Sequence, residues 1–97
     1  MTITRYELAP QFDSRQSFYR KAFISIDSDA AGNTVSRLRS YDAHVASILI
    51  DSHGMEYVAL FPQWDSSATT LRHVKEFLRQ NGFKAETKSQ IKADYHG

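Results

Sequence analysis

The sequence predicts a single α+β domain in which an antiparallel sheet of three or four strands packs against one main C-terminal helix. Two observations carry this prediction. Short alternating or apolar segments, separated by turn residues, fill the first two thirds of the chain. One later segment, residues 64–83, combines a helix start signal, a helical period and a stop signal. The 97 residues, 41% hydrophobic and 24% charged, fit one domain with one modest core.

The first strands are marked by alternation and by turn formers. Residues 1–15 alternate weakly before Pro10, which predicts a short edge strand or a loosely docked arm. Residues 17–26 form a stronger strand, but aromatic side chains occur on both of its faces, so the buried face stays open. Turn formers at residues 27–33 then reverse the chain into a strand over residues 34–41.

The next two strands are predicted to form a hairpin. Residues 44–50 are the most apolar strand and are expected in the interior of the sheet. Residues 51–54 form a tight turn in which Gly54 is available for a positive φ, and residues 55–61 pair back antiparallel until Pro62. The connections are too short for parallel crossovers, so the sheet is expected to be an antiparallel meander.

The main helix is defined at both ends. Asp65, Ser66 and Ser67 offer side-chain oxygens to the first amides, and Gly82 with Phe83 has the pattern of a Schellman cap. Four apolar residues between them span an arc of roughly 120° that should lie on the sheet. They are Leu71, Val74, Phe77 and Leu78.

A short second helix is predicted over residues 88–95. Thr87 and Gln90 have the spacing of a capping box, and Ile91 and Tyr95 lie four residues apart on one side. The chain has no internal repeat, low-complexity tract or linker, so residues 1–97 are expected to form one domain.

Charge and residue usage exclude several function classes. Twelve Lys and Arg against eleven Asp and Glu leave a formal charge of +1, so any electrostatic function must come from local patches. The chain has no cysteine, which excludes disulfides and thiolate metal sites and suits a reducing compartment. No run approaches the roughly 18 apolar residues of a membrane span, and the start lacks a signal-peptide core. A cytoplasmic protein of the host cell is expected.

The sequence contains no complete catalytic or metal-binding motif. His73 borders the core arc of the main helix, but a general acid-base role needs a carboxylate that the sequence does not place beside it. The other histidines lack the spacing of metal ligands. A calcium-loop pattern begins at Asp27, yet Leu38 stands where the bidentate glutamate is required. We therefore expect no catalytic residue, no metal site and no cofactor.

Two groups of basic residues are candidate binding surfaces. The first is a stripe beside the core arc of the main helix, formed by Arg72, Lys75 and Arg79. The second is a basic and aromatic sheet face, which forms if the first two strong strands pair and contains Tyr19, Lys21, Arg37, Arg39 and Tyr41. For both groups, the alternative interpretation is an ordinary solvated surface.

Three segments carry a resemblance to a known family: residues 17–22, residues 38–48 and the helix segment over residues 66–83. The chain resembles a family of short uncharacterised proteins encoded by phages, plasmids and integrated elements, mainly of Firmicutes. The sequence departs from the family pattern at Ala43, where members often carry threonine. The matching positions are Ser40, Tyr41, Val45 and Ala46 in the middle segment and Ser67, Thr69, Thr70, His73, Phe77 and Leu78 in the helix.

Three function hypotheses follow. The resemblance implies a small non-enzymatic binding protein of a mobile genetic element that contacts a host protein or nucleoprotein, and inhibition of a Cas9-type CRISPR nuclease is one form, by analogy alone. The alternative is a module that binds single-stranded DNA or RNA on the basic and aromatic sheet face. An enzyme would require a pocket that brings His73 near a carboxylate. An exposed sheet edge also makes a homodimer a reasonable expectation.

Overall fold

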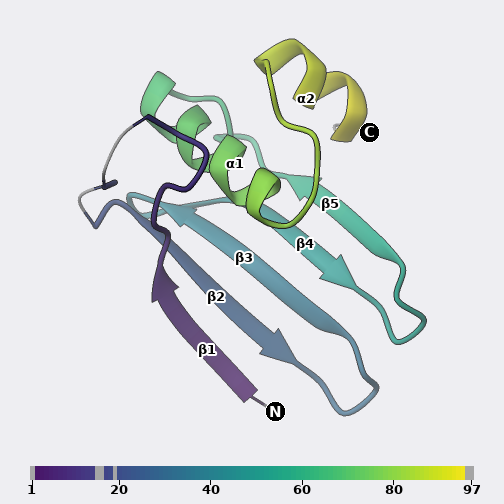
Figure 1. Cartoon of the computed structure of the whole chain (residues 1–97). Helices are drawn as coiled ribbons and strands as arrows, with labels where there is room; N and C mark the ends of the chain where they lie inside the picture. Colours follow the sequence, from purple (N-terminus) through teal and green to yellow (C-terminus); the bar gives the residue numbers. More distant parts are fainter. Residues whose placement is uncertain (1, 15–16, 19, 96–97) are drawn as a thin grey trace.

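A computed structural model of the chain describes residues 2–14, 17–18 and 20–95. Five strands form one antiparallel sheet in the order β1-β2-β3-β4-β5, and two helices lie on one side of it (Figure 1). The predicted α+β class and antiparallel meander are confirmed. The elements are β1 (Thr2–Glu7), β2 (Ala22–Ser28), β3 (Thr34–Ser40), β4 (Ala43–Ile50), β5 (Glu56–Leu60), α1 (Ala68–Gln80) and α2 (Lys88–Tyr95).

The sheet has one strand more than the upper limit of the sequence prediction. The additional strand is β1, which pairs antiparallel with β2 from Thr2 opposite Ser28 to Glu7 opposite Phe23. The ladder is continued by Leu8, whose amide donates to Ala22 O at 2.9 Å and whose side chain is buried. The weak alternation of this segment was a poor signal because β1 is an edge strand and its side chains from Thr4 to Glu7 are exposed.

The structure identifies the buried face of β2, which the sequence left open. Ala22 and Ile24 point into the core, and Phe23 between them points to the other face. The core between the sheet and α1 is completed by apolar residues of β3, β4 and α1. They are Leu38, Val45, Ala46, Ile48, Val74, Phe77 and Leu78.

Both ends of α1 match the predicted caps. Ser67 Oγ accepts the Thr70 amide at 3.0 Å and caps the N-terminus. Gly82 has φ of 87°, and the Phe83 amide donates to Leu78 O at 2.9 Å, which are features of the Schellman cap. The helix is shorter than residues 64–83, because Trp64 lies in a turn in which its amide donates to Phe61 O.

The segment between β1 and β2 crosses the polar face of α1. We call residues 9–14 the strap. Glu76 of α1 has an exposed fraction of 1%, and its carboxylate accepts the amides of Gln11, Phe12 and Asp13 at 2.9 to 3.0 Å. Gln80 Nε2 donates to Ala9 O at 2.7 Å. The strap therefore buries a charged side chain on the polar face of α1.

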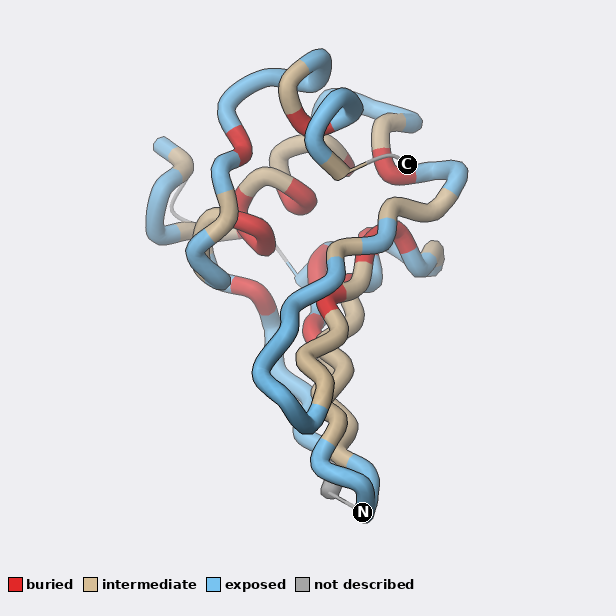
Figure 2. The backbone as a smooth tube through the Cα atoms, turned by 90° about the vertical axis from the view of Figure 1, so that its right-hand side faces the viewer, coloured by how far each residue is buried: buried red, intermediate tan, exposed pale blue. Residues whose placement is uncertain are grey.

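The helices cover only part of the sheet. Figure 2 shows the buried residues gathered where the helices face the strands, whereas the far ends of the strands extend beyond this region and consist of intermediate and exposed residues. Among the described residues, no helix combines the length and the apolar character needed to cross a membrane.

Candidate functional site

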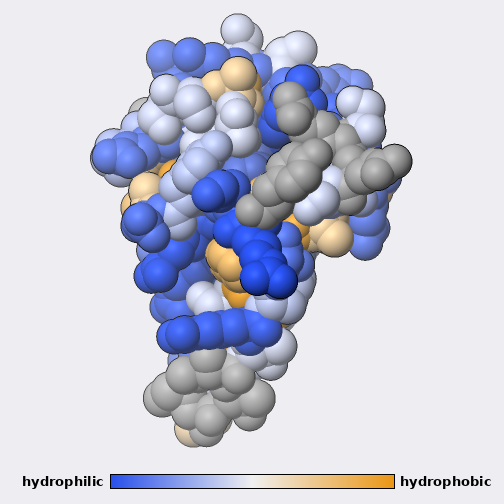
Figure 3. Space-filling view, turned by 90° about the vertical axis from the view of Figure 1, so that its left-hand side faces the viewer, coloured by the Kyte–Doolittle hydropathy of each residue, from blue (hydrophilic) through white to orange (hydrophobic). Residues whose placement is uncertain are grey.

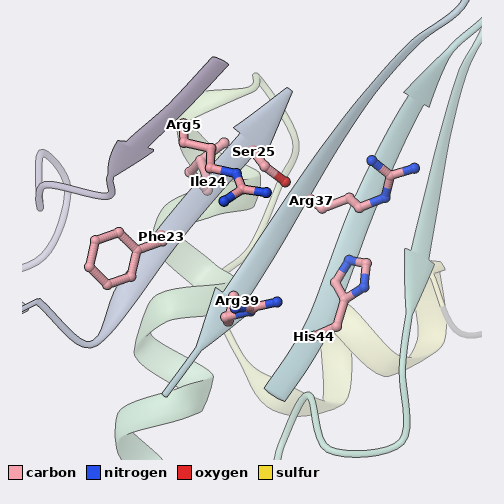
Figure 4. Close-up of a pocket in the computed structure, with 7 residues that line it drawn as sticks. All are labelled: Arg5, Phe23, Ile24, Ser25, Arg37, Arg39 and His44. Atoms are coloured by element: carbon pink, nitrogen blue, oxygen red, sulfur yellow. The ribbon is translucent and has the colours of Figure 1, made fainter. Parts of the chain in front are cut away.

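The sheet face opposite α1 is the clearest candidate site. Figure 4 shows both described helices behind the sheet, whereas the basic side chains stand in front of it. Residues directly opposite each other in an antiparallel pair point to the same face. Two neighbouring rows of such residues cross β1 to β4: Arg5, Ser25, Arg37 and Ser47, then Glu7, Phe23, Arg39 and His44. We call the surface of Arg5, Phe23, Arg37, Arg39 and His44 the arginine face.

A groove of about 250 Å³ opens on the arginine face. Its floor includes Ile24 and Ser25, and its walls are the five residues of the arginine face. Arg5 reaches from β1 across β2, so basic groups from β1 and β3 border the same hollow (Figure 4). Figure 3 views the molecule from the β1 side, where the surface is mostly hydrophilic and apolar atoms are visible only between polar side chains.

The three arginines of this face differ in their partners. Arg37 Nη1 forms an ion pair with Asp27 on the same face. Neither Arg5 nor Arg39 has an ion-pair partner within the part of the chain that the structure describes. Glu7 also belongs to this face, and its carboxylate accepts the Arg20 amide at 2.9 Å. Because neither acid lines the groove, the potential inside the groove is positive.

His44 lies beside the arginines as a neutral group. Burial lowers the pKa of His44, and the positive charges of Arg37 and Arg39 lower that pKa further. The imidazole packs against the Phe61 ring with 4.8 Å between the ring centroids. At neutral pH, His44 therefore offers a ring and hydrogen-bonding nitrogens rather than a third unpaired charge.

Phe23 lines this cationic groove with an exposed aromatic ring. It is 40% exposed, although it stands in the middle of the row that joins Glu7 to His44. An exposed phenylalanine bordered by arginines provides a flat apolar surface next to donors of hydrogen bonds. Sequence reasoning omitted Arg5, Phe23 and His44. The alternation of β2 already gave a signal for Phe23, but Arg5 depended on the unrecognised pairing of β1 with β2.

A model of the family of unknown function DUF8033 matches residues 6–93, which is nearly the whole chain. The chain belongs to this family. No curated protein and no solved structure matches the chain.

Two residues of the predicted sheet face lie elsewhere in this DUF8033 chain. Tyr41 has φ of 57° in the turn after β3, so the alternation of β3 ends at Ser40. The Tyr41 ring lies 6.1 Å from the His73 ring of α1, and Lys21 Nζ lies 5.9 Å from the Tyr41 ring. Lys21 and Tyr41 therefore belong to the helix side, whereas Arg37 and Arg39 share the bare face. Tyr19 lies outside the described residues.

The predicted helix stripe is divided by the strap. Arg72 Nη1 forms an ion pair with Asp13 of the strap at 3.1 Å. Lys75 and Arg79 stay half-exposed, and neither has an ion-pair partner among the described residues. The stripe therefore offers two unpaired cations on a helix, without an aromatic side chain of the arginine face beside them. Within the described part of the chain, no group of three His, Asp or Glu could hold a metal ion.

Proposed function

We propose that the protein binds single-stranded nucleic acid on the arginine face. The observation that carries the proposal is the convergence of Arg5, Arg37 and Arg39 on one groove beside exposed Phe23. Arginines attract and hydrogen-bond phosphates, whereas an exposed aromatic ring stacks on a base. Both kinds of group are needed for a single strand, because its phosphates and its base faces are accessible together.

The aromatic component favours a single strand over a duplex. In a duplex the base faces are already stacked on their neighbours, so Phe23 would have no base face to contact. The groove of about 250 Å³ that Phe23 lines is smaller than the pockets that hold drug-sized ligands, which suits a single base. RNA-binding sheets likewise present aromatic rings and basic side chains on an uncovered sheet face.

Fluorescence anisotropy with a labelled strand of about 15 nucleotides, dT or rU, tests the proposal. We expect binding at about 50 mM salt that weakens steeply towards about 200 mM. If the three arginines neutralise two to three phosphates, the plot of log K against log salt has a slope of roughly −1.4 to −2. The matched duplex is expected to bind more weakly at each salt concentration.

A pair of double variants locates the surface. Arg5→Ala with Arg39→Ala removes two unpaired charges from the arginine face and is expected to abolish most of the binding at about 200 mM salt. Lys75→Ala with Arg79→Ala removes the same charge from α1 and is expected to leave binding close to that of the wild type. A flat titration of the wild type at low salt contradicts the proposal. Loss of binding only in the α1 variant would transfer the site to the helix stripe.

The mobile-element resemblance supports a second candidate, in which the same face docks on a host nucleoprotein. Arginine and aromatic side chains are enriched at protein interfaces, and the arginine face presents both on an uncovered surface. In this case the wild-type protein, but not the Arg5→Ala and Arg39→Ala variant, co-purifies with a loaded Cas9-type nuclease and inhibits its cleavage. If the protein neither co-purifies with the nuclease nor inhibits its cleavage, this second candidate is contradicted. Single-stranded nucleic acid then remains the proposed ligand.

A further inference from the structure

A second pocket lies on the helix side of the sheet, where the N-terminal end of α1 meets the end of β3. Its volume is about 210 Å³. Its lining differs from that of the arginine face, because it includes two cations, a hydroxyl, two aromatic rings and a buried imidazole. These residues are Lys21, Arg72, Thr69, Phe18, Tyr41 and His73, and Ser17 also lines the pocket.

His73 is the most deeply buried of the described residues that line this pocket. It lines the pocket although its exposed fraction is 0%. Its Nδ1 lies 2.7 Å from Ser40 Oγ, and its ring is enclosed by Phe18 at 4.6 Å and Tyr41 at 6.1 Å between centroids. The other ring nitrogen, Nε2, has no hydrogen-bond partner within the part of the chain that the structure describes. A buried polar atom of this kind is unfavourable for folding unless something pairs with it.

The hydroxyl chain beside His73 defines which nitrogen carries the proton. Ser40 Oγ donates to Thr70 Oγ1 at 3.1 Å, so the single hydroxyl hydrogen of Ser40 is already used. With this hydrogen on Thr70 Oγ1, we assign His73 Nδ1 as the donor to Ser40 Oγ. Burial lowers the pKa of His73 to about 4, and the nearby Asp13 carboxylate opposes this shift. At neutral pH the imidazole is neutral, and its Nε2 is a bare acceptor.

The rest of the pocket is suited to an anion. Thr69 is the second residue of α1, so the pocket adjoins the helix end where unpaired amides and the helix dipole favour negative charge. Lys21 is exposed, and its charge is not held by a carboxylate in the described chain. Arg72 uses Nη1 for Asp13, but a guanidinium has five N–H donors and keeps others available.

We propose that this pocket binds a protonated phosphate group, whose P–OH donates to His73 Nε2 while Lys21 and Arg72 neutralise its charge. Inorganic phosphate carries at least one P–OH at neutral pH, and a phosphomonoester gains one near its second pKa of about 6. Sulfate has a similar size and charge but no hydrogen to donate. The pocket is therefore expected to prefer phosphate to sulfate, because it combines cationic side chains with a hydrogen-bond acceptor on His73.

An NMR titration of the ¹⁵N-labelled protein tests the inference through the His73 Nε2 resonance. With inorganic phosphate at constant ionic strength, we expect this resonance to shift and to saturate in the millimolar range. Sulfate at the same concentrations is expected to leave it unchanged. An unmoved resonance in phosphate, or equal titrations with the two anions, overturns the inference.

Two lysine variants compare a residue of the pocket with a residue outside it. Lys21→Ala removes an exposed side chain at the rim and is expected to weaken phosphate binding at least about fivefold. Lys92→Ala removes an exposed lysine of α2 and is expected to leave it unchanged. Equal affinities of the two variants contradict the inference.

A further experiment distinguishes a phosphate at the end of a nucleic-acid strand from the free phosphate ion. At pH near 6, where monoesters are protonated, a 5′-phosphorylated strand and its unphosphorylated equivalent are each added to the protein. A His73 shift with the phosphorylated strand alone identifies a strand end as ligand, and a shift with inorganic phosphate alone identifies the free ion. Strand binding to the arginine face does not need a terminal phosphate, so failure here leaves that proposal intact.

Discussion

The two sides of the sheet hold charged residues of the same kinds in opposite ways. On the helix side, Arg72 is paired with Asp13, and Glu76 is buried beneath the strap with three backbone amides on its carboxylate. On the arginine face, Arg5 and Arg39 have no ion-pair partner among the described residues, and Phe23 beside them is exposed. Pairing alone does not divide the two sides, because Arg37 is paired with Asp27, whereas Lys75 and Arg79 have no ion-pair partner among the described residues. The strap, however, covers charged groups on the helix side only.

This difference separates scaffold from binding surface better than charge counts do. The helix stripe and the arginine face each carry three basic residues, one of them in an ion pair, and only the strap, the groove and the exposed Phe23 ring distinguish the two surfaces. A carboxylate that accepts several backbone amides fixes a segment in place. An arginine without a carboxylate keeps its donors for a ligand. Substitutions on the helix side are therefore expected to change stability, whereas substitutions on the arginine face are expected to change binding.

The largest effect is expected from Glu76→Ala. The substitution leaves the amides of Gln11, Phe12 and Asp13 without their acceptor, so the strap detaches or keeps unpaired donors. We expect the free energy of unfolding in urea to fall by about 3 kcal/mol. Glu86→Ala, at an exposed residue that pairs with Lys84 at the surface, is the control and is expected to cost less than about 0.5 kcal/mol. If the two variants are equally stable, the strap contributes little to the fold.

The next effect is a dependence of stability on pH. The pKa of His73 falls from 6.5 to about 4 on folding, so between these values the unfolded chain binds more protons than the folded chain. Stability is therefore greatest above about pH 6.5 and is lost as the pH falls towards 4, by roughly 3 kcal/mol in total. Urea unfolding at several pH values measures this loss.

Two histidine variants assign the pH dependence. His73→Gln is expected to flatten the curve between pH 6.5 and 4, whereas His53→Gln, in an exposed turn, is expected to retain it. His44 acts in the same direction because its pKa is also lowered, with a smaller effect since its side chain is exposed. An unchanged slope in His73→Gln would show that the buried imidazole is not the titrating group.

The sequence predicted the elements whose signals are local. Capping oxygens, the positive φ of Gly82 and the turn before Gly54 depend on a few neighbouring residues, and all three were confirmed. What it did not predict depends on distant contacts. No local pattern shows that residues 11–13 donate to Glu76, which lies more than sixty residues later in the chain. The same contact turns a predicted solvent face of α1 into a buried one.

For the candidate site too, the sequence predicted only the part that depends on local signals. Alternation within β3 placed Arg37 and Arg39 together, because that signal needs only one strand. Arg5 joins them through the pairing of β1 with β2, which is a long-range contact. Tyr41 leaves the face because its backbone is left-handed, and a tyrosine gives no sequence signal for that conformation.

Phe23→Ala tests the arginine face. The ring is exposed, so stability is expected to stay near that of the wild type. Loss of one stacking contact is worth about 1 to 3 kcal/mol, so strand affinity is expected to fall about tenfold or more with an unchanged salt slope. Phe12→Ala removes a 56% exposed ring from the strap and is expected to leave binding unchanged. Equal losses in both variants would indicate nonspecific apolar contact.

The smallest effect is expected from Arg39→Ala, and it separates the two kinds of contact on the arginine face. Removal of one phosphate contact reduces the salt slope by about 0.7, and the few-fold loss of affinity disappears at high salt. Lys75→Ala, which removes an equal charge from α1, is the control and should alter neither quantity. Because Phe23→Ala changes affinity without the slope and Arg39→Ala changes the slope, anisotropy measured over a range of salt concentrations distinguishes stacking from charge. If Arg39→Ala leaves the slope unchanged, the unpaired guanidinium does not contact phosphate, and the contrast between the two sides of the sheet does not extend to binding.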